Sequence, residues 1–233
     1  MSSDSANTLL IPEADLSRLR HCNHHNPHGF YGWHPTETGS VIRTRQIGAQ
    51  KVELLIADKP TEMSPIGDDI FAIELSATEA FDYRLRVTWP GQEPQVTADP
   101  YAFLPTLGDM DIYLISEGRH ERLWDVLGAN IKTYETMIGE VKGTAFAVWA
   151  PNAIGVAVVG NFNGWNASQH AMRSMGGSGV WELFIPNVGA GEVYKFALQT
   201  KAGQRRDKAD PMARLAELPP STGSIIVESE YEW

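Results

Sequence analysis

Cysteine is almost absent from this sequence of 233 residues, because Cys22 is the only one. A single cysteine excludes a disulfide within the chain, which is usual in a reducing compartment. Long hydrophobic runs are missing as well, since no stretch approaches the roughly eighteen consecutive apolar residues of a membrane-spanning helix. The N-terminal residues lack the basic start and the apolar run of a secretory signal. These absences predict a cytoplasmic protein that does not span or bind a membrane.

Positive charge is also scarce. The chain has 19 Lys and Arg against 29 Asp and Glu, which gives a formal net charge of −10. Such a chain repels phosphate backbones and anionic lipid surfaces. We therefore expect neither nucleic acid nor a membrane as partner, whereas a neutral polymer is indifferent to this charge.

Motifs of catalysis and metal binding are missing too. The sequence contains no Gly-rich phosphate loop, no G-x-S-x-G and no H-E-x-x-H. His21, His24, His25 and His28 have a spacing that would align metal ligands on a helix, but Pro27 interrupts such a helix. We predict no metal, no cofactor and no catalytic residue in this chain.

Short apolar or alternating runs, separated by Pro, Gly, Asn and Asp, predict strands at the spacing of β-sandwiches. A short helix is expected over residues 13–20, and residues 114–138 form a helix-tolerant stretch broken by glycines. The predicted fold is all-β, with two tandem immunoglobulin-like β-sandwiches and short helical connections. The expected strands cover residues 41–45, 51–56, 70–75, 81–89, 144–149, 155–159, 180–185, 193–199 and 224–228.

An internal repeat supports the division into two modules. Ala98-Asp99-Pro100 recurs as Ala209-Asp210-Pro211, and Tyr83-Arg84 recurs at the same offset as Tyr194-Lys195. The offset between the copies is smaller further upstream, so the second copy has gained residues in an interval that contains GNFNGWNAS. Asp99 and Asp210 precede proline and are interpreted as turn-forming residues rather than as a catalytic carboxylate pair. The repeat predicts a duplicated sandwich.

The segment GNFNGWN, residues 160–166, is the most distinctive motif. Asn163-Gly164 is a favoured pair for a type I′ turn, and such a turn would project Trp165 from the sandwich. An indole ring can stack on the apolar face of a sugar while polar side chains bind its hydroxyl groups. The candidate polar groups are Asn161, Asn163, Asn166 and Lys195.

The alternative for Trp165 is a place in the core, where tryptophans usually lie. Trp181 and Phe184 occupy a predicted strand and are expected in the core. Trp149 precedes an Ala-Pro turn, where packing in the core or between modules is favoured over ligand binding.

The run TAFAVWAPNAIGVAVVGNFNGWN, followed by GVWELFIP, YKF and ADP, resembles family-48 carbohydrate-binding modules of the α-amylase superfamily. NPHGFYGWH, ADPYAF and EGRHERLWDVLGA resemble the N-terminal region of bacterial glycogen (1,4-α-glucan) branching enzymes. The resemblance implies a first module over residues 1–110 and a second, glucan-binding module over residues 111–233. Binding modules in this family often carry a second aromatic platform where this sequence reads KAGQRRD.

This resemblance implies a non-catalytic front end that guides or binds α-1,4-glucan. Its other expected partner is a catalytic barrel, which lies outside this sequence and carries the family's catalytic carboxylates. The parent enzymes cleave α-1,4 links and transfer the chain to form α-1,6 branches. Three alternatives remain open: a debranching or trehalose-forming relative, a stand-alone glycogen-targeting module, and an immunoglobulin-like interaction module.

Overall fold

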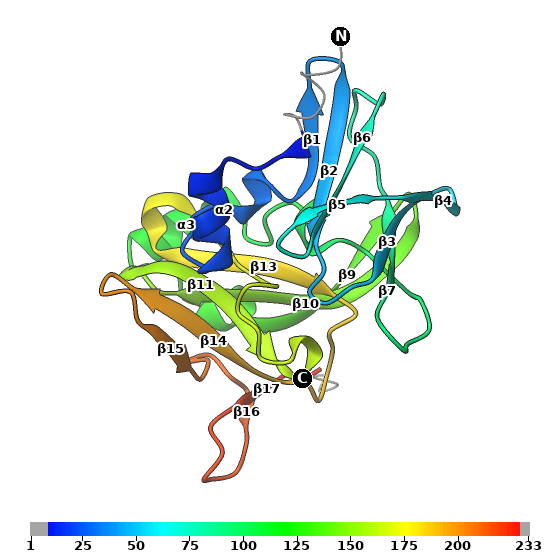
Figure 1. The fold of residues 1–233 in the computed structure, drawn as a ribbon. Coiled ribbons are helices and arrows are strands. Elements are labelled where there is room, and N and C mark those ends of the chain that lie inside the picture. Colours follow the sequence, from blue (N-terminus) through cyan, green and yellow to red (C-terminus); the bar gives the residue numbers. More distant parts are fainter. Residues whose placement is uncertain (1–8, 229–233) are drawn as a thin grey trace.

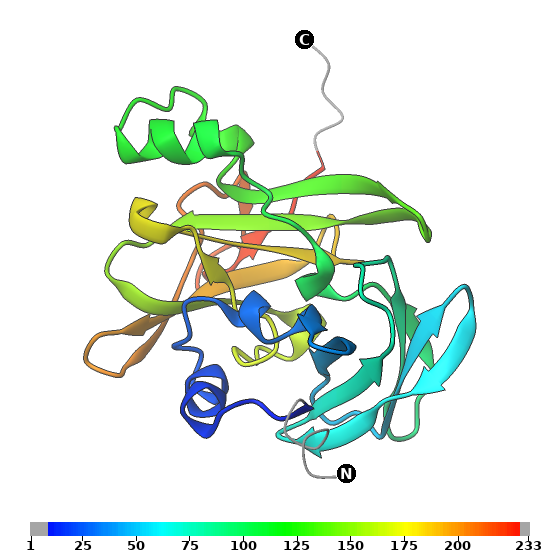
Figure 2. The same ribbon diagram turned by 90° about the horizontal axis from the view of Figure 1, so that it is seen from above.

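The computed structural model describes residues 9–228, in which strands dominate and α-helices are short (Figures 1 and 2). The first helix has two acidic residues in its first turn and two arginines near its end, which suits the helix dipole. The strands lie in four antiparallel sheets. The α-helices are α2 (Glu13–Arg20) and α3 (Asp109–Ser116), and the 3-10 turns are η1 (Pro27–Gly29), η2 (Pro100–Ala102), η3 (Leu123–Asp125), η4 (Asn161–Asn163) and η5 (Gly176–Ser178).

The first sandwich is built from eight strands. They are β1 (Gly32–Thr36), β2 (Gly39–Arg45), β3 (Lys51–Ile56), β4 (Lys59–Glu62), β5 (Ser64–Gly67), β6 (Ile70–Leu75), β7 (Arg84–Thr88) and β8 (Gln95–Thr97). One sheet has the order β1-β2-β6-β5 and the other β4-β3-β7-β8. Apolar side chains from both sheets, including Ile42, Leu54 and Leu85, form its core. This core contains only residues of the first half.

The second sandwich follows after α3. Its strands are β9 (Gly128–Thr136), β10 (Gly139–Trp149), β11 (Ala153–Gly160), β12 (Arg173–Ser174), β13 (Val180–Pro186), β14 (Val193–Thr200), β15 (Arg205–Lys208), β16 (Leu215–Ala216) and β17 (Ser224–Ile225). One sheet has the order β12-β13-β10-β9, and the other has the order β11-β14-β17-β16 with β15 beside β14. Within the described residues, no strand of one half pairs with a strand of the other. The predicted all-β fold with two sandwiches is confirmed.

The predicted division between residues 110 and 111 lies within α3, the helix that precedes the strands of the second sandwich. Within the helix-tolerant stretch of residues 114–138, the α-helix α3 ends at Ser116, and residues 128–136 form the strand β9. Strand β9 reads GANIKTYET, and its β-branched and aromatic residues favour a strand.

The N-terminal segment packs on the second sandwich. A Cβ atom added to Gly155 in β11 would lie 1.8 Å from the backbone oxygen of Cys22, so the two backbones are in direct contact. Ser174 donates to the carbonyl of His25 over 2.8 Å, and the His25 ring stacks on Trp181 with centroids 5.7 Å apart. The segment before the first sandwich is therefore part of the second sandwich's structure.

The connection between the sandwiches is anchored by Glu182, whose side chain is fully buried in β13. Its Oε2 accepts from the Thr106 backbone N–H over 3.0 Å and from the Thr106 hydroxyl over 2.9 Å. Its Oε1 accepts from Arg173, whose guanidinium also donates to the carbonyl of Phe103. A buried carboxylate thus fixes the crossing segment to the sheet.

The internal repeat has a matching geometry in both sandwiches. The Tyr83 hydroxyl donates to the Asp99 carboxylate over 2.8 Å, and Tyr194 donates in the same way to Asp210. Each aspartate also accepts the backbone N–H two residues later, from Tyr101 in the first copy and Met212 in the second. The aspartates therefore hold buried turns, as predicted, and both are sequestered from solvent.

Within residues 9–228, no helix is long and apolar enough to cross a membrane.

Candidate glucan-binding face

The GNFNGWN turn begins one residue later than the sequence suggested. Gly164 and Trp165 have positive φ values of 58° and 61°, whereas Asn163 ends the 3-10 turn η4. The Asn166 N–H donates to the Asn163 carbonyl over 3.1 Å and closes the turn. The prediction of positive φ at Asn163 is wrong, because its side chain is needed inside the fold.

Asn163 is buried and fully engaged. Its Oδ1 accepts from the Gly160 N–H over 3.0 Å, and its Nδ2 donates to the Val158 carbonyl over 2.9 Å. The same Nδ2 lies 2.8 Å from a ring nitrogen of His170. These bonds fasten the turn to the end of β11. Asn163 therefore supports the turn from beneath and is not counted among the groups that face a ligand.

Trp165 lies partly buried on the outer face of the sheet that contains β11 and β14. It packs against a cluster of small side chains that includes Ala157, Val159 and Ala197. Its indole N–H donates to Oδ1 of Asn161 over 3.2 Å, so the ring has a fixed orientation. The side chain lies outside the core of the sandwich and retains some exposure, as a sugar-stacking ring requires.

Lys195 projects from this same outer face. It stands opposite Val159 in the register of β11 and β14, and cross-strand partners share a face. Its neighbours Tyr194 and Phe196 point inward and are buried. The Lys195 ammonium donates to the Thr222 hydroxyl over 2.7 Å, at the exposed surface.

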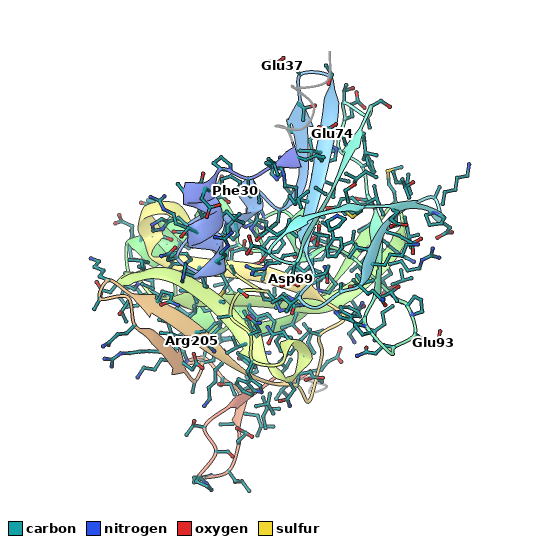
Figure 3. All side chains as sticks on the ribbon, viewed as in Figure 1. Phe30, Glu37, Asp69, Glu74, Glu93 and Arg205 are labelled. Atoms are coloured by element: carbon teal, nitrogen blue, oxygen red, sulfur yellow. The ribbon has the colours of Figure 1, made fainter. Side chains whose placement is uncertain are left out.

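Strand β15 adds Arg205 to the face (Figure 3). Arg205 stands opposite Gln199 on β14, and its guanidinium donates to the Trp165 carbonyl over 3.2 Å. It also holds Asp207 in an exposed ion pair, with Nε 2.7 Å from the carboxylate. This arginine comes from the KAGQRRD stretch, which contributes no aromatic side chain to the face.

Asn166 has a local role. Its Oδ1 accepts from the Ser168 N–H over 3.0 Å and from the Ser168 hydroxyl over 2.7 Å. Such Asx turns fix a loop by local bonds. Of the predicted polar groups, Asn161 and Lys195 thus lie on the face with Trp165, Asn163 lies beneath it, and Asn166 shapes the loop.

Sequence reasoning missed Thr222 and Asp207 as members of this face. Both depend on strand pairing that no local pattern reveals, because Thr222 approaches β14 from the hairpin of β16 and β17. The assembled face has an indole, amide and hydroxyl groups, the ammonium of Lys195, and the Arg205–Asp207 ion pair, in which the two charges offset each other. That composition suits a neutral, hydroxyl-rich ligand.

Comparisons with known proteins give a match for each half of the chain. Residues 126–213 match the model of carbohydrate-binding module 48, the isoamylase N-terminal domain. Residues 12–101 match the model of the alpha-1,4-glucan branching enzyme GlgB N-terminal domain. The first of these regions covers β9 to β15 of the second sandwich, and the second covers the N-terminal segment and the first sandwich.

Curated relatives extend the match to the whole chain. It is 80% identical over 233 residues to the 1,4-alpha-glucan branching enzyme GlgB of Corynebacterium efficiens. It is 74% identical over 233 residues to the enzyme of that name in Corynebacterium glutamicum, and 58% identical over 235 aligned residues to that of Corynebacterium diphtheriae. In each case the match takes in 100% of this chain and 32% of the relative. The chain thus spans about a third of these relatives' length.

Proposed function

Because this chain carries the N-terminal domain of the GlgB branching-enzyme family followed by a carbohydrate-binding module 48, we propose that it serves a 1,4-α-glucan branching enzyme by binding α-1,4-glucan. The activity of that enzyme is part of the proposal: cleavage of an α-1,4 link and transfer of the chain to form an α-1,6 branch. The catalytic carboxylates are assigned to the region of the relatives that this chain does not cover. The matched GlgB domain over residues 12–101 favours this function over a debranching or trehalose-forming one.

The observation that supports glucan binding is the shared face of Trp165 and Lys195. A pyranose ring stacks on the indole, whose plane is fixed by the bond from its N–H to Asn161. The Lys195 ammonium and the Thr222 hydroxyl, 2.7 Å apart, bind the hydroxyl groups of the neighbouring glucose unit. Arg205 supports the backbone of Trp165 from β15.

One stacking ring gives weak binding. Stacking of a base on an aromatic side chain contributes roughly 1–3 kcal/mol, and a sugar face gives about the lower end of that range. Without a second aromatic platform we expect a dissociation constant of about 1 mM, which corresponds to about −4 kcal/mol. The module therefore guides a glucan chain rather than retaining it.

The test is a titration of the 233-residue chain with maltoheptaose, followed by NMR chemical shifts. Trp165→Ala should weaken binding about five- to tenfold, as expected from the loss of about 1 kcal/mol of stacking. Trp165 is only partly buried, so this variant should melt close to the native protein. Unchanged binding together with a large loss of thermal stability would show that Trp165 is a packing residue.

The same chain should have no branching or hydrolytic activity on amylose. Iodine staining and reducing ends measure both reactions. Protein-dependent activity above a heat-treated control would contradict the assignment of the catalytic groups to the rest of the enzyme. A cytoplasmic location belongs to the same proposal, supported by a single buried thiol, Cys22, that can form no disulfide within the chain.

A further inference from the structure

The turn that carries Trp165 has a strained backbone. Trp165 has a φ of 61°, in the left-handed region that bulky side chains rarely adopt. Such a conformation persists only where neighbouring groups hold it in place. The Trp165 N–H donates to the Gly160 carbonyl over 3.0 Å, and the Asn166 N–H donates to the Asn163 carbonyl over 3.1 Å. The orientation of the indole therefore depends on how firmly Gly160 and Asn163 are held.

His170 completes the hydrogen bonds of the Asn163 side chain. Because Oδ1 of Asn163 accepts from the Gly160 N–H over 3.0 Å, the orientation of the amide is fixed, and both protons of Nδ2 need acceptors. One proton is donated to the Val158 carbonyl over 2.9 Å, and Nδ1 of His170 lies 2.8 Å away for the other. Burial lowers the pKa of His170 to about 4, so its ring is neutral near pH 7 and Nδ1 can accept. Without this acceptor, a buried N–H would lose its partner.

Tyr101, which follows the last strand of the first sandwich, holds His170 in this place. Its hydroxyl lies 3.2 Å from the Gln169 carbonyl and 3.2 Å from the Ala171 carbonyl, so it bonds to the residues on both sides of His170. The carbonyl of His170 accepts from the Val158 N–H over 3.0 Å, which orders the same segment along β11. The segment that presents His170 is thus fixed both by β11 and by Tyr101.

The first sandwich in turn fixes Tyr101. The Asp99 carboxylate accepts from the Tyr101 N–H over 3.0 Å and from the Tyr83 hydroxyl over 2.8 Å. A Cβ atom added to Gly32 in β1 would lie 2.6 Å from the Tyr101 backbone oxygen, so the backbones of these two residues are in close contact. Tyr101 is buried and belongs to the same core as Phe146 of the second sandwich. It is therefore held by one module and reaches into the other.

We propose that the first module positions the glucan-binding turn of the second, with Tyr101 and His170 as positioning residues that act on Trp165 through Asn163. This inference rests on the proposed binding of glucan at Trp165. Tyr101 and His170 are both buried, so they act through the turn and not by contact with the glucan. The first sandwich thereby gains a function in binding, because it fixes the orientation of a stacking ring that lies on its neighbour.

Two substitutions of nearly equal size test His170. In His170→Asn the new amide oxygen can lie where Nδ1 lies and accept from Asn163, whereas the side chain in His170→Leu has the same shape and no acceptor. In an NMR titration of the 233-residue chain with maltoheptaose, His170→Leu should bind about fivefold more weakly than the native chain, and His170→Asn should stay within about twofold of it. Equal affinities in the two variants, whether native or reduced, would overturn the proposal, because His170 would then contribute only its packing or nothing.

Tyr101→Phe keeps the ring and removes only the hydroxyl, so it tests the contact between the modules even if His170→Leu fails to fold. It should bind maltoheptaose about threefold more weakly. Thr144→Val is the matched control, because it removes a buried hydroxyl bond of the second sandwich, to the Val188 carbonyl over 2.7 Å, that does not involve the turn. Native affinity in Tyr101→Phe, or an equal loss in Thr144→Val, would refute the role of the first module.

The indole N–H resonance of Trp165 distinguishes a failure of this inference from a failure of glucan binding. If the native chain gives no saturable shift with maltoheptaose, binding at Trp165 is refuted. The positioning of the ring is then judged in the unbound proteins, where the indole resonance should move in His170→Leu and in Tyr101→Phe and stay in place in His170→Asn. An unchanged resonance in His170→Leu and Tyr101→Phe would refute the positioning itself.

Discussion

Replacing Asp99 by Asn should change how the stability of the chain depends on pH. Asp99 is completely buried, and burial raises the pKa of its carboxyl to about 6, despite hydrogen bonds from Tyr101 and Tyr83. An unfolded chain has an ordinary aspartate pKa of about 3.9. Between these values the folded protein holds more protons than the unfolded chain, so the free energy of unfolding falls as the pH rises.

The magnitude follows from the two pKa values. One pKa unit corresponds to about 1.4 kcal/mol, so the gap between about 3.9 and about 6 represents about 3 kcal/mol. This contribution is fully present below pH 4 and is lost as the pH rises through 6. In Asp99→Asn the amide oxygen can still accept from the Tyr101 N–H, and the side chain at this position no longer titrates. The variant should therefore gain up to about 3 kcal/mol relative to the native protein between pH 4 and pH 7.

Urea unfolding, followed by tryptophan fluorescence at half-unit steps from pH 4 to pH 7, measures this difference. Asp58→Asn is the control, because Asp58 lies in an exposed turn at a φ of 61° that asparagine also tolerates. The control should run parallel to the native protein. Parallel curves for Asp99→Asn as well would show that burial does not govern this carboxyl, and the reasoning would be wrong.

Three further predictions concern packing. Gly155→Ala should destabilise the protein by about 1–3 kcal/mol, because the added Cβ would lie 1.8 Å from the Cys22 oxygen, whereas Gly189→Ala meets nothing within 4 Å and should be near neutral. Trp181→Ala should lower the free energy of unfolding by about 3–5 kcal/mol, because this side chain is 2% exposed and donates to the Ala150 carbonyl. A loss below about 1 kcal/mol in thermal melting would contradict a core role. A chain of residues 111–233 lacks the N-terminal segment that helps to form the core of the second sandwich, so it should expose apolar surface, bind a hydrophobic dye and melt well below the full chain. Melting at the same temperature as the full chain would disprove that dependence.

Much of the fold could be predicted from local pattern. The helix over residues 13–20 matches α2, and the strands over residues 51–56 and 70–75 match β3 and β6. These segments have strong periodicity and clear boundaries, which are the signals that sequence reasoning uses. The predicted stretch at residues 224–228 shortens to β17, because β16 has only two residues and β14 pairs with β17 only at Val193 and Tyr194.

The candidate site was less predictable. Trp165 and Lys195 were identified from their residue types. The alternation along β14 indicates which face Lys195 occupies, but only the pairing of β11 with β14 brings it to the same face as Trp165. Asn163 shows the limit: asparagine suits both an exposed turn and a buried network, and only the surrounding carbonyl and N–H groups decide between them. The glucan-binding roles of these residues stay predictions until binding is measured.

The packing of the N-terminal segment on the second sandwich has a consequence for synthesis on the ribosome. Leu19 belongs to the same core as Tyr194 and Ile226, so these partners are synthesised long after it. Translation at roughly 5–20 residues per second separates the synthesis of Leu19 from that of Ile226 by about 10–40 s. During that time the first sandwich can fold around its own core, while the N-terminal segment before it still exposes apolar side chains. Completion of the second sandwich therefore requires contacts between residues that are far apart in the sequence, and such contacts form slowly. Until they form, the nascent chain needs protection from aggregation.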